Sequence, residues 1–363
     1  MKPDKIEEID RNMKVESAFT EENIAFYDIR QDPFDVYGLY NYRTEPEFKR
    51  LPDDVAEATS PGVAHLAKST AGGRVRFSTD SDVVVIRSEM PYICRMDHMA
   101  LTGSAGFDLY DDDPEMQTSR FRGTFRPPVG MTDGYTQKIN LWSKKKRCFT
   151  IHFPTYSGVK NLWIGLSKDA SVGHGMPYRA MPPIVYYGSS ITQGACSSHP
   201  GNAYQAIIAR RTGIDFQNFG FSGCGKGESA IVSYLATLPM SVFVSDYDHN
   251  APDFRHLEAT HCNLYRAIRE KHPDIPYIMV SKPDFLPGSE DQERRRDVVT
   301  ATFRYARESG DKNVYYVDGE SLFRGPDAEL CTVEGCHPTD AGLAKMADAI
   351  GHEINMALYL KKR

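Results

Sequence analysis

The spacing of hydrophobic positions divides the chain into two parts with different periodicities. From residue 24 to about residue 172, short aromatic or β-branched segments are separated by Gly, Pro, Asp and Ser, and several segments alternate apolar with polar residues. This alternation is typical of strands with one buried face. Helical patterning is absent except near residues 54–67, where we expect a short helix or a loop excursion. The pattern predicts an all-β, jelly-roll-like sandwich.

After a Gly- and Pro-rich connection at residues 173–183, the pattern changes to alternating strands and helices. The predicted strands are 184–187, 215–219, 241–246, 277–281 and 314–317, and the predicted helices are 204–211, 228–235, 254–271, 292–309 and 339–359. This order is typical of a parallel sheet covered by helices on both faces. We therefore expect a β-sandwich domain over residues 1–175, beginning with a loose charged arm to about residue 20, and an α/β domain over residues 182–363.

Charge and cysteine content restrict the partners and the setting. The net charge of -6 and the pI near 6.0 argue against a nucleic-acid or anionic-membrane partner, and the basic run 144–147 is interpreted as a solvated turn. No apolar segment approaches the roughly 18–20 residues of a membrane span, and the N-terminus lacks the apolar core of a signal peptide. Seven cysteines without a disulfide spacing favour a reducing, cytoplasmic setting. The pattern carries no signal for oligomeric state.

Candidate chemistry begins where the first strand of the second domain ends. The strand 184–187 stops at Gly188, and Ser190 follows in a hydroxyl-rich turn that leads towards a helix. A serine at this point lies at the carboxyl edge of the sheet, where open α/β folds bind ligands. Because serine alone is a weak nucleophile, the prediction requires a base and an oxyanion hole elsewhere in the chain.

Three later blocks supply those parts. A glycine-rich stretch, 218–227, follows the second strand and can direct backbone N–H groups towards one point. Asn250 follows the third strand and offers an amide donor to the same oxyanion. His337 precedes the last helix as a candidate general base, and Glu334 stands three residues before it, where a loop can turn the carboxylate back onto the imidazole.

These four blocks, in this order, resemble the SGNH (GDSL-like) hydrolase family over residues 182–358. The resemblance implies a flavodoxin-like three-layer α/β/α domain. It assigns the nucleophile to Ser190 in GSSITQG and the base to His337 in EGCHP. Glu334 then stands where the family normally has Asp. Asp318 is the alternative orienting acid, and a Ser–His dyad without an acid is a further alternative.

The same resemblance assigns the oxyanion hole. Its donors are the backbone N–H groups of Ser190 and Gly223 and the side-chain amide of Asn250. Three neighbouring residues, Ser189, Cys224 and His249, are candidates for substrate contact, with packing or exposed loop positions as the alternative. Cys331, Cys336 and His337 match no familiar zinc spacing, so we expect no metal and no organic cofactor.

The fit is closest to a bacterial subgroup that has GSSITQG, a following Pro-Gly, GFSGxGKG and, in an N-terminal β-domain, Gly-x-Asp-Leu-Tyr. Here Pro200 and Gly201 supply the dipeptide, and Gly106-Phe-Asp-Leu-Tyr110 supplies the last motif. We interpret Asp108 and Tyr110 as residues that fix a turn of the β-domain rather than as sugar ligands. The subgroup resemblance implies esterases or acetylhydrolases that act on acylated carbohydrates.

The sequence therefore predicts a serine esterase that hydrolyses small O-acyl esters, foremost acetyl esters of a carbohydrate-like alcohol, through an acyl-enzyme. One alternative is a lipid-directed esterase or thioesterase, although the polar, glycine-rich loops do not suggest a long acyl groove. Another is a carbohydrate-binding protein with a vestigial hydrolase domain. The joint presence of Ser190, Gly223, Asn250 and His337 argues against that alternative.

Overall fold

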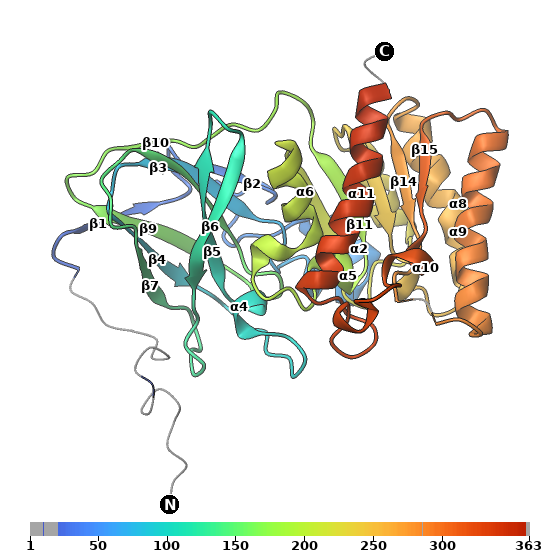
Figure 1. Ribbon diagram of the computed structural model, residues 1–363, viewed down its shortest axis with the longest axis horizontal. Helices are drawn as coiled ribbons and strands as arrows, with labels where there is room; N and C mark the ends of the chain where they lie inside the picture. The colour runs from blue at the N-terminus through green and yellow to red at the C-terminus, as the bar shows by residue number, and fades with distance from the viewer. Residues whose placement is uncertain (1–9, 11–20, 285, 361–363) are drawn as a thin grey trace, which may run out of the picture.

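The computed structural model describes residue 10 and residues 21–284 and 286–360, and its two halves lie side by side (Figure 1). The predicted N-terminal arm lies, apart from residue 10, outside the described residues. The N-terminal half contains ten strands among the described residues: β1 (Ile24–Asp28), β2 (Asp35–Tyr37), β3 (Arg74–Thr79), β4 (Val83–Glu89), β5 (Phe107–Asp113), β6 (Thr118–Phe125), β7 (Thr136–Asn140), β8 (Arg147–His152), β9 (Asn161–Ser167) and β10 (Val172–His174). Its helices are α2 (Asp53–Thr59), α3 (Pro61–Leu66) and α4 (Leu101–Ser104).

The strands of the N-terminal half form two antiparallel sheets. One sheet has the order β1-β9-β4-β7, and the other has the order β10-β3-β8-β5-β6, with β2 paired to β3. Apolar residues of both sheets, among them Phe77, Ile86, Phe149 and Ile164, share one buried core. The alternation in the sequence thus produces the expected β-sandwich, because each strand buries the residues of one face.

The C-terminal half alternates strands with helices as predicted. Its strands are β11 (Ile184–Gly188), β12 (Phe216–Gly220), β13 (Val242–Asp246), β14 (Tyr277–Val280) and β15 (Val314–Val317). Its helices are α5 (Ser190–Gln193), α6 (Tyr204–Thr212), α7 (Ser229–Thr237), α8 (Phe254–Lys271), α9 (Glu290–Glu308), α10 (Gly319–Leu322) and α11 (Asp340–Leu360), with short 3-10 turns η2 (Pro200–Asn202), η3 (Asp248–Asn250) and η4 (Ala328–Leu330). All ten predicted elements are present. The sequence did not predict α4 or α10, because a helix of four residues is too short to show a period.

The five strands form one parallel sheet in the order β12-β11-β13-β14-β15. This 2-1-3-4-5 order is the flavodoxin-like arrangement. Helices α6 and α11 contribute to the core on one face, and α7, α8 and α9 contribute to the core on the other. Gly188 pairs in register with Gly220 of β12 and with Asp246 of β13, so three strands end together at one edge. That edge is where the predicted site residues converge.

The two halves share an interface that reaches the strand next to the site. Helix α2 packs against α7, so the predicted excursion covers part of the α/β domain. The buried guanidinium of Arg50 donates to the carbonyls of Asn218, at 3.0 Å, and Gly220, at 2.7 Å. Arg74, also buried, donates to the carbonyl of Phe216 at 3.1 Å. The β-domain therefore fixes β12, the strand that leads into the glycine-rich loop.

Asp108 of the Gly-x-Asp-Leu-Tyr motif connects the two halves, a wider role than the turn that we expected. Its fully buried carboxylate accepts hydrogen bonds from His152 at 2.8 Å within the β-domain, and from His199 at 2.5 Å and the N–H of Gly201 at 2.6 Å across the interface. Both histidines bond through Nδ1. The motif of the β-domain thus binds the Pro-Gly segment of the other half directly. The bonds from His152 and His199 hold the pKa of Asp108 well below its ordinary value, although burial pushes it upward.

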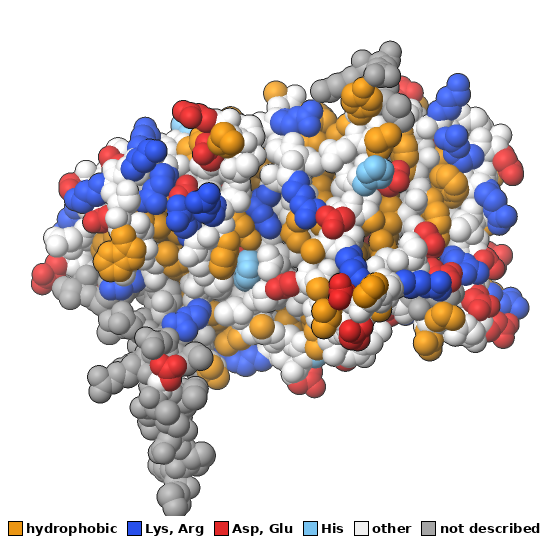
Figure 2. Space-filling model, in the orientation of Figure 1, with side chains coloured by type: hydrophobic (Ala, Val, Ile, Leu, Met, Phe, Trp, Pro, Cys, Tyr) orange, Lys and Arg blue, Asp and Glu red, His pale blue; other side chains and the backbone are white. Residues whose placement is uncertain are grey.

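The surface carries intermixed charge. Figure 2 shows acidic and basic side chains interspersed over the face in view, in keeping with the modest net charge. Residues 144–146 of the basic run are exposed in the connection between β7 and β8, as predicted, whereas Arg147 begins β8 and its side chain is mostly buried. Among the described residues, no helix combines the length and apolarity needed to cross a membrane.

Candidate active site

Ser190 begins helix α5 immediately beyond the end of β11, as predicted. The side chain of Ser189 caps this helix by accepting a hydrogen bond from the N–H of Ile191 at 3.2 Å. A Cβ at Gly188 would stand 2.1 Å from Oγ1 of Thr192 and 2.3 Å from the carbonyl oxygen of Asp246. Glycine is therefore required at the turn, because α5 folds back closely over the strand ends.

The hydroxyl of Ser190 contacts the ring of His337, a residue 147 positions away. Ser190 Oγ lies 2.9 Å from His337 Nε2. On the other side of the ring, Nδ1 lies 2.8 Å from Oε1 of Glu334, and the same oxygen accepts the backbone N–H of His337 at 2.9 Å. Asp318, the alternative acid, instead caps α10 by accepting the N–H of Glu320. Glu334 is thus the carboxylate that holds the imidazole.

The charge on Glu334 is stabilised where it contacts the ring. Partial burial raises the pKa of this carboxyl, but the hydrogen bonds from the backbone and ring of His337 outweigh burial and bring the pKa below its ordinary value. Glu334 is therefore ionised at neutral pH. An ionised acceptor fixes the tautomer with hydrogen on Nδ1 and leaves Nε2 free to accept a proton from Ser190.

The glycine-rich loop beyond β12 is held in place by Gln193 of α5. Gly223 has a φ of +63°, which favours glycine, and no described atom lies within 4 Å of the position of a Cβ there. The N–H of the preceding Ser222 donates to Oε1 of Gln193 at 2.9 Å, while Nε2 of this fully buried side chain donates to the carbonyl of Thr155 at 3.1 Å. Gln193 thus connects the loop to the β-domain.

The β-domain also contacts the backbone of Ser190. The hydroxyl of Tyr156 donates to the carbonyl oxygen of Ser190 at 3.3 Å. The sequence does not predict these roles of Tyr156 and Gln193, because both depend on contacts between the two halves. The one available signal was Gln193 itself, an amide within the first motif that no predicted step used.

Asn250 lies beside the glycine-rich loop, and its amide faces that loop. Nδ2 donates to the carbonyl of Phe221 at 2.8 Å and of Gly225 at 3.2 Å, and it also contacts the carbonyl of Cys224. These carbonyls occupy both N–H groups of the amide. Donation to an oxyanion, as predicted, requires one of these bonds to be exchanged.

The three candidate substrate contacts have mainly structural partners. Ser189 is fully buried as the cap of α5, and the Sγ of Cys224 lies against Gly62 of α3. His249 has a buried side chain whose Nε2 lies 2.5 Å from Oδ1 of Asp284. Burial lowers the pKa of His249, but hydrogen bonds to Asp248 and Asp284 outweigh it and raise the pKa well above the ordinary value. His249 is thus engaged by carboxylates of the same half.

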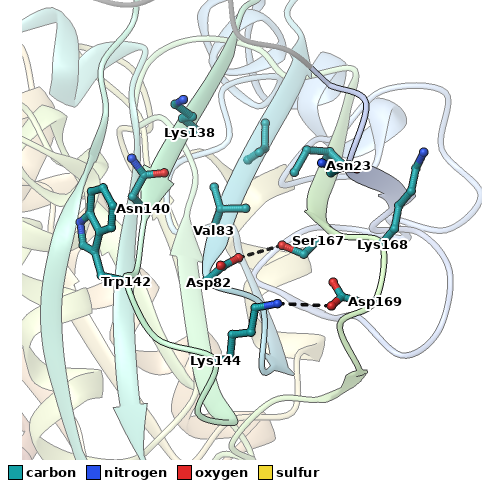
Figure 3. A pocket seen from close by; sticks show the side chains of 12 residues that line it. Asn23, Asp82, Val83, Lys138, Asn140, Trp142, Lys144, Ser167, Lys168 and Asp169 are labelled. Atoms are coloured by element: carbon teal, nitrogen blue, oxygen red, sulfur yellow. Dashed lines mark hydrogen bonds and ion pairs between the residues drawn. The ribbon is translucent and has the colours of Figure 1, made fainter.

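The β-sandwich carries a separate hollow of about 630 Å³ on its own surface (Figure 3). Trp142, 86% exposed, stands on one side of it together with Asn140. The ion pair of Lys144 with Asp169, at 3.3 Å, lies on another side. All its lining residues belong to the β-sandwich, so this hollow is distinct from the contacts around Ser190.

Two protein families match successive parts of the chain. Residues 181–355 match the GDSL-like Lipase/Acylhydrolase family, and residues 24–172 match GxDLY, the N-terminus of SGNH-hydrolase-type esterases. No protein in the comparison with curated sequences matches the chain.

Solved structures share the arrangement of both halves. A GDSL-like lipase from Bacteroides ovatus is 27% identical with a TM-score of 0.82, covering 93% of this chain and 98% of its own. The salicylyl-acyltransferase SsfX3 from a tetracycline biosynthetic pathway is 19% identical with a TM-score of 0.73, covering 92% and 98%. A family two carbohydrate esterase from Clostridium thermocellum is 15% identical with a TM-score of 0.62, covering 90% and 99%. The chain belongs to the SGNH (GDSL-like) hydrolases, in the subgroup with a GxDLY β-domain, and is an ester hydrolase of that type.

Proposed function

We propose that the chain is a serine esterase that removes small acyl groups, foremost acetyl, from a carbohydrate-like alcohol. The observation that carries the proposal is the continuous hydrogen-bonded series from Glu334 through His337 to Ser190, with contacts of 2.8 Å and 2.9 Å. A serine hydroxyl needs such a base, held in one tautomer, to attack an ester at neutral pH.

In the first half of the reaction, Ser190 Oγ attacks the carbonyl carbon while His337 Nε2 takes its proton. Glu334 retains the Nδ1 hydrogen and stabilises the imidazolium. The oxyanion of the tetrahedral intermediate accepts from the backbone N–H groups of Ser190 and Gly223. Ser190 occupies the first position of a helix, where the N–H has no partner within the helix. Asn250 supplies a third donor when one of its loop contacts is exchanged.

The intermediate then collapses and His337 gives its proton to the leaving alkoxide, which ends the first half with the acyl group bonded to Ser190 as an ester. In the second half, water enters, loses a proton to His337 and attacks this ester, and the acid leaves as Ser190 regains its hydrogen. Each proton removed by the imidazole is returned within the same half-reaction.

The proposed substrate class rests on the chemistry of the site and on the similarity to solved structures. The Clostridium thermocellum protein of the same two-part architecture is a carbohydrate esterase, which favours an acylated sugar. The Bacteroides ovatus protein is described as a lipase, so a lipid-directed esterase or thioesterase is the competing enzyme. A third candidate is a carbohydrate-binding protein. The exposed Trp142 beside a polar hollow favours it, because aromatic faces pack on sugar rings.

Hydrolysis of p-nitrophenyl acetate, butyrate and octanoate by the native chain and by Ser190→Ala separates these candidates. We expect turnover to be fastest with acetate and to fall at least about 10⁴-fold in Ser190→Ala. A preference for octanoate would identify a lipid-directed enzyme. A native rate equal to that of Ser190→Ala would exclude the esterase and favour the carbohydrate-binding protein.

Release of acetate from acetylated methyl glycosides then tests whether the alcohol part of the substrate is a carbohydrate. Trp142→Ala serves as the control variant, because Trp142 lies on the β-sandwich and is not part of the series from Glu334 to Ser190. We expect Trp142→Ala to retain the native kcat on p-nitrophenyl acetate. Failure of the native chain to release acetate from any glycoside would remove the carbohydrate part of the proposal.

A further inference from the structure

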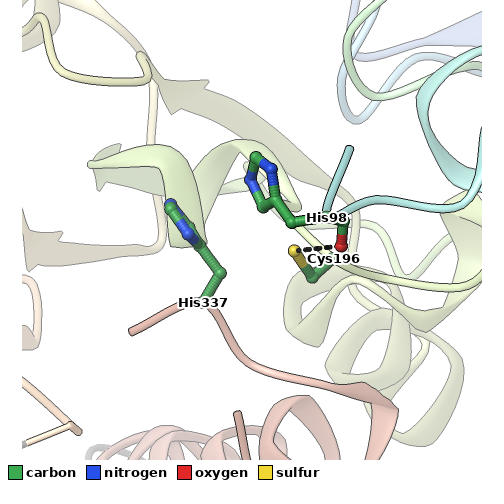
Figure 4. A group of neighbouring side chains, drawn as sticks. All are labelled: His98, Cys196 and His337. Carbon is green, nitrogen blue, oxygen red and sulfur yellow. Dashed lines mark hydrogen bonds between the residues drawn. The ribbon is translucent and has the colours of Figure 1, made fainter. Parts of the chain in front are cut away.

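Three side chains from distant parts of the chain meet at the candidate base, which is one of them. His98 comes from the β-domain loop between β4 and α4, Cys196 follows α5, and His337 precedes α11 (Figure 4). One nitrogen of each histidine and the sulfur of Cys196 all lie within 4.8 Å of one another. The two ring centroids are 5.2 Å apart, and the Cys196 thiol donates to the carbonyl of His98 at 3.4 Å. The fold thus gathers two imidazoles and one thiol at one point.

Two nitrogens and one sulfur are a ligand set that suits zinc. Zn²⁺ binds His nitrogen at about 2.0–2.1 Å and Cys sulfur at about 2.3 Å in tetrahedral sites, which places the ligand atoms roughly 3.3–3.6 Å apart. The observed separations exceed this by no more than roughly 1–1.5 Å, which side-chain rotation can remove. His98 and His337 keep side-chain exposures of 30% and 23%, so an ion can reach them from solvent.

The carboxylate contacts at Nδ1 of both histidines also favour metal binding. His98 Nδ1 lies 3.0 Å from Oδ1 of Asp97, and His337 Nδ1 lies 2.8 Å from Oε1 of Glu334. A carboxylate that accepts the Nδ1 hydrogen leaves the lone pair on Nε2, which is how zinc-binding histidines are held in metalloproteins. Two such pairs therefore leave the Nε2 lone pairs of both histidines available in the cluster that contains the thiol.

We propose that His98, Cys196 and His337 bind one Zn²⁺ and that the bound ion inhibits the esterase. The ion replaces the proton of the Cys196 thiol, which passes to solvent, and a water molecule or Ser190 Oγ completes the tetrahedron. His337 Nε2 then donates its lone pair to the metal and cannot accept the proton of Ser190. The inhibition rests on the proposed function of His337, whereas the binding does not.

Sequence spacing did not reveal this site, because only His337 belongs to the short segment with the other cysteines. Cys336 is the competing sulfur, near His249 and Asp284 or near Glu334 and His337. In the first group, His249 is already paired with Asp284 at 2.5 Å, and in the second, Glu334 already holds the ring of His337. The set with Cys196 keeps the carboxylate contacts of both histidines, and it ends only the contact of the thiol with His98 and that of His337 with Ser190.

Calorimetric titration of ZnCl₂ into the full chain tests the binding directly, and Ser190→Ala provides the same ligands without esterase chemistry. We expect one ion per chain in both proteins. His98→Ala and Cys196→Ser should each bind at least about tenfold more weakly. Cys336→Ser and His174→Ala should bind as the native chain does. His174 is a matched control, because its Nδ1 also faces a carboxylate, Asp35 at 3.1 Å.

Cobalt substitution identifies the sulfur ligand by spectroscopy. Co²⁺ should give a thiolate-to-metal charge-transfer band in the native chain and in Cys336→Ser, and this band should be absent in Cys196→Ser. Thermal unfolding confirms that each variant folds, and His98→Gln replaces His98→Ala if the latter does not. Native affinity in both Cys196→Ser and His98→Ala, or loss of the band in Cys336→Ser alone, would overturn the site.

Activity measurements separate the two proposals. Zn²⁺ should stop p-nitrophenyl acetate hydrolysis by the native chain, a chelator should restore it, and Mg²⁺ should have no effect, because it prefers oxygen ligands. Zinc binding by a chain without esterase activity would refute the proposed function and leave the metal site intact. An active chain that binds zinc at this site without losing activity would refute the inhibition.

Discussion

At the scale of single residues, Glu334 shows how a longer acid can occupy the position of an aspartate. Its Oε1 accepts two hydrogen bonds from one residue, the ring and the backbone N–H of His337. The three-residue separation closes this small loop, and the additional methylene extends the carboxylate to the ring. One oxygen therefore sets both the position and the tautomer of the base.

Replacing the charge while keeping the shape tests this role. In Glu334→Gln we expect kcat for p-nitrophenyl acetate to fall about 10³- to 10⁴-fold with little change in KM, because a neutral amide neither fixes the tautomer nor stabilises the imidazolium. Asp318→Asn, which alters the alternative acid, should retain the native kcat. A loss of less than tenfold in Glu334→Gln would show that Ser190 and His337 work as a dyad.

At the scale of elements, the site depends on how closely α5 and the glycine-rich loop pack over the sheet edge. A Cβ at Gly220 would stand 2.1 Å from the backbone nitrogen of Gln193, so β12 and α5 are in direct contact. Gln193 then uses both ends of its amide, one on the loop and one on the β-domain. The position of Gly223 is thereby set by a fully buried side chain.

Gln193→Ala tests this positioning role through the split between kcat and KM. We expect kcat to fall about 10²-fold, because a displaced Gly223 N–H no longer meets the oxyanion, while KM changes little. Gln205→Ala is the matched control, since this buried amide donates to the carbonyl of Thr192 at 2.7 Å and does not touch the loop. Equal losses of kcat in the two variants would show that Gln193 has only a structural role.

The elements of the α/β domain were predictable because each has a strong local pattern. The run 184–187 is apolar and β-branched, and 254–271 has a clear helical period, so neither depends on distant contacts for its identity. The series Ser190, His337 and Glu334 was also predicted, because its residues stand in motifs at a strand end and before a helix. Gln193, Tyr156 and His98 were not predicted, since their roles arise from contacts across the two domains.

At the scale of the whole molecule, Asp108 is the charged centre of the interface between the domains. It accepts from His152 on one side and from His199 and Gly201 on the other, without exposure to solvent. A carboxylate with three donors is stable when buried, whereas each donor would lose its partner if the charge were removed. The two motifs that hold these residues are therefore one structural unit, although 90 residues separate them in the sequence.

Asp108→Asn should lower the free energy of unfolding by about 3–5 kcal/mol at pH 7, because the new amide places N–H groups against donors. The folded-state pKa of Asp108 lies below its unfolded value, so its stabilisation is present above pH of about 4 and is lost as the pH falls. Urea unfolding at pH 7 and at about pH 2.5, well below the unfolded pKa, checks both parts.

The control for this prediction is Asp35→Asn. Asp35 also accepts from a histidine, His174, and from the N–H of Gly175, but this pair is exposed. We expect a change of about 1 kcal/mol or less. A difference between native and Asp108→Asn that stays constant from pH 7 to about pH 2.5 would contradict the role of the buried charge.

The central claim is that Ser190 is made nucleophilic by the hydrogen-bonded series behind it, and covalent labelling tests this most directly. After brief exposure to a fluorophosphonate, intact mass spectrometry of the native chain should show one added phosphonyl group, and peptide mapping should place it on Ser190. The same exposure should leave Ser190→Ala and His337→Ala unlabelled. A native chain that takes no label, or one labelled equally in His337→Ala, would contradict the account.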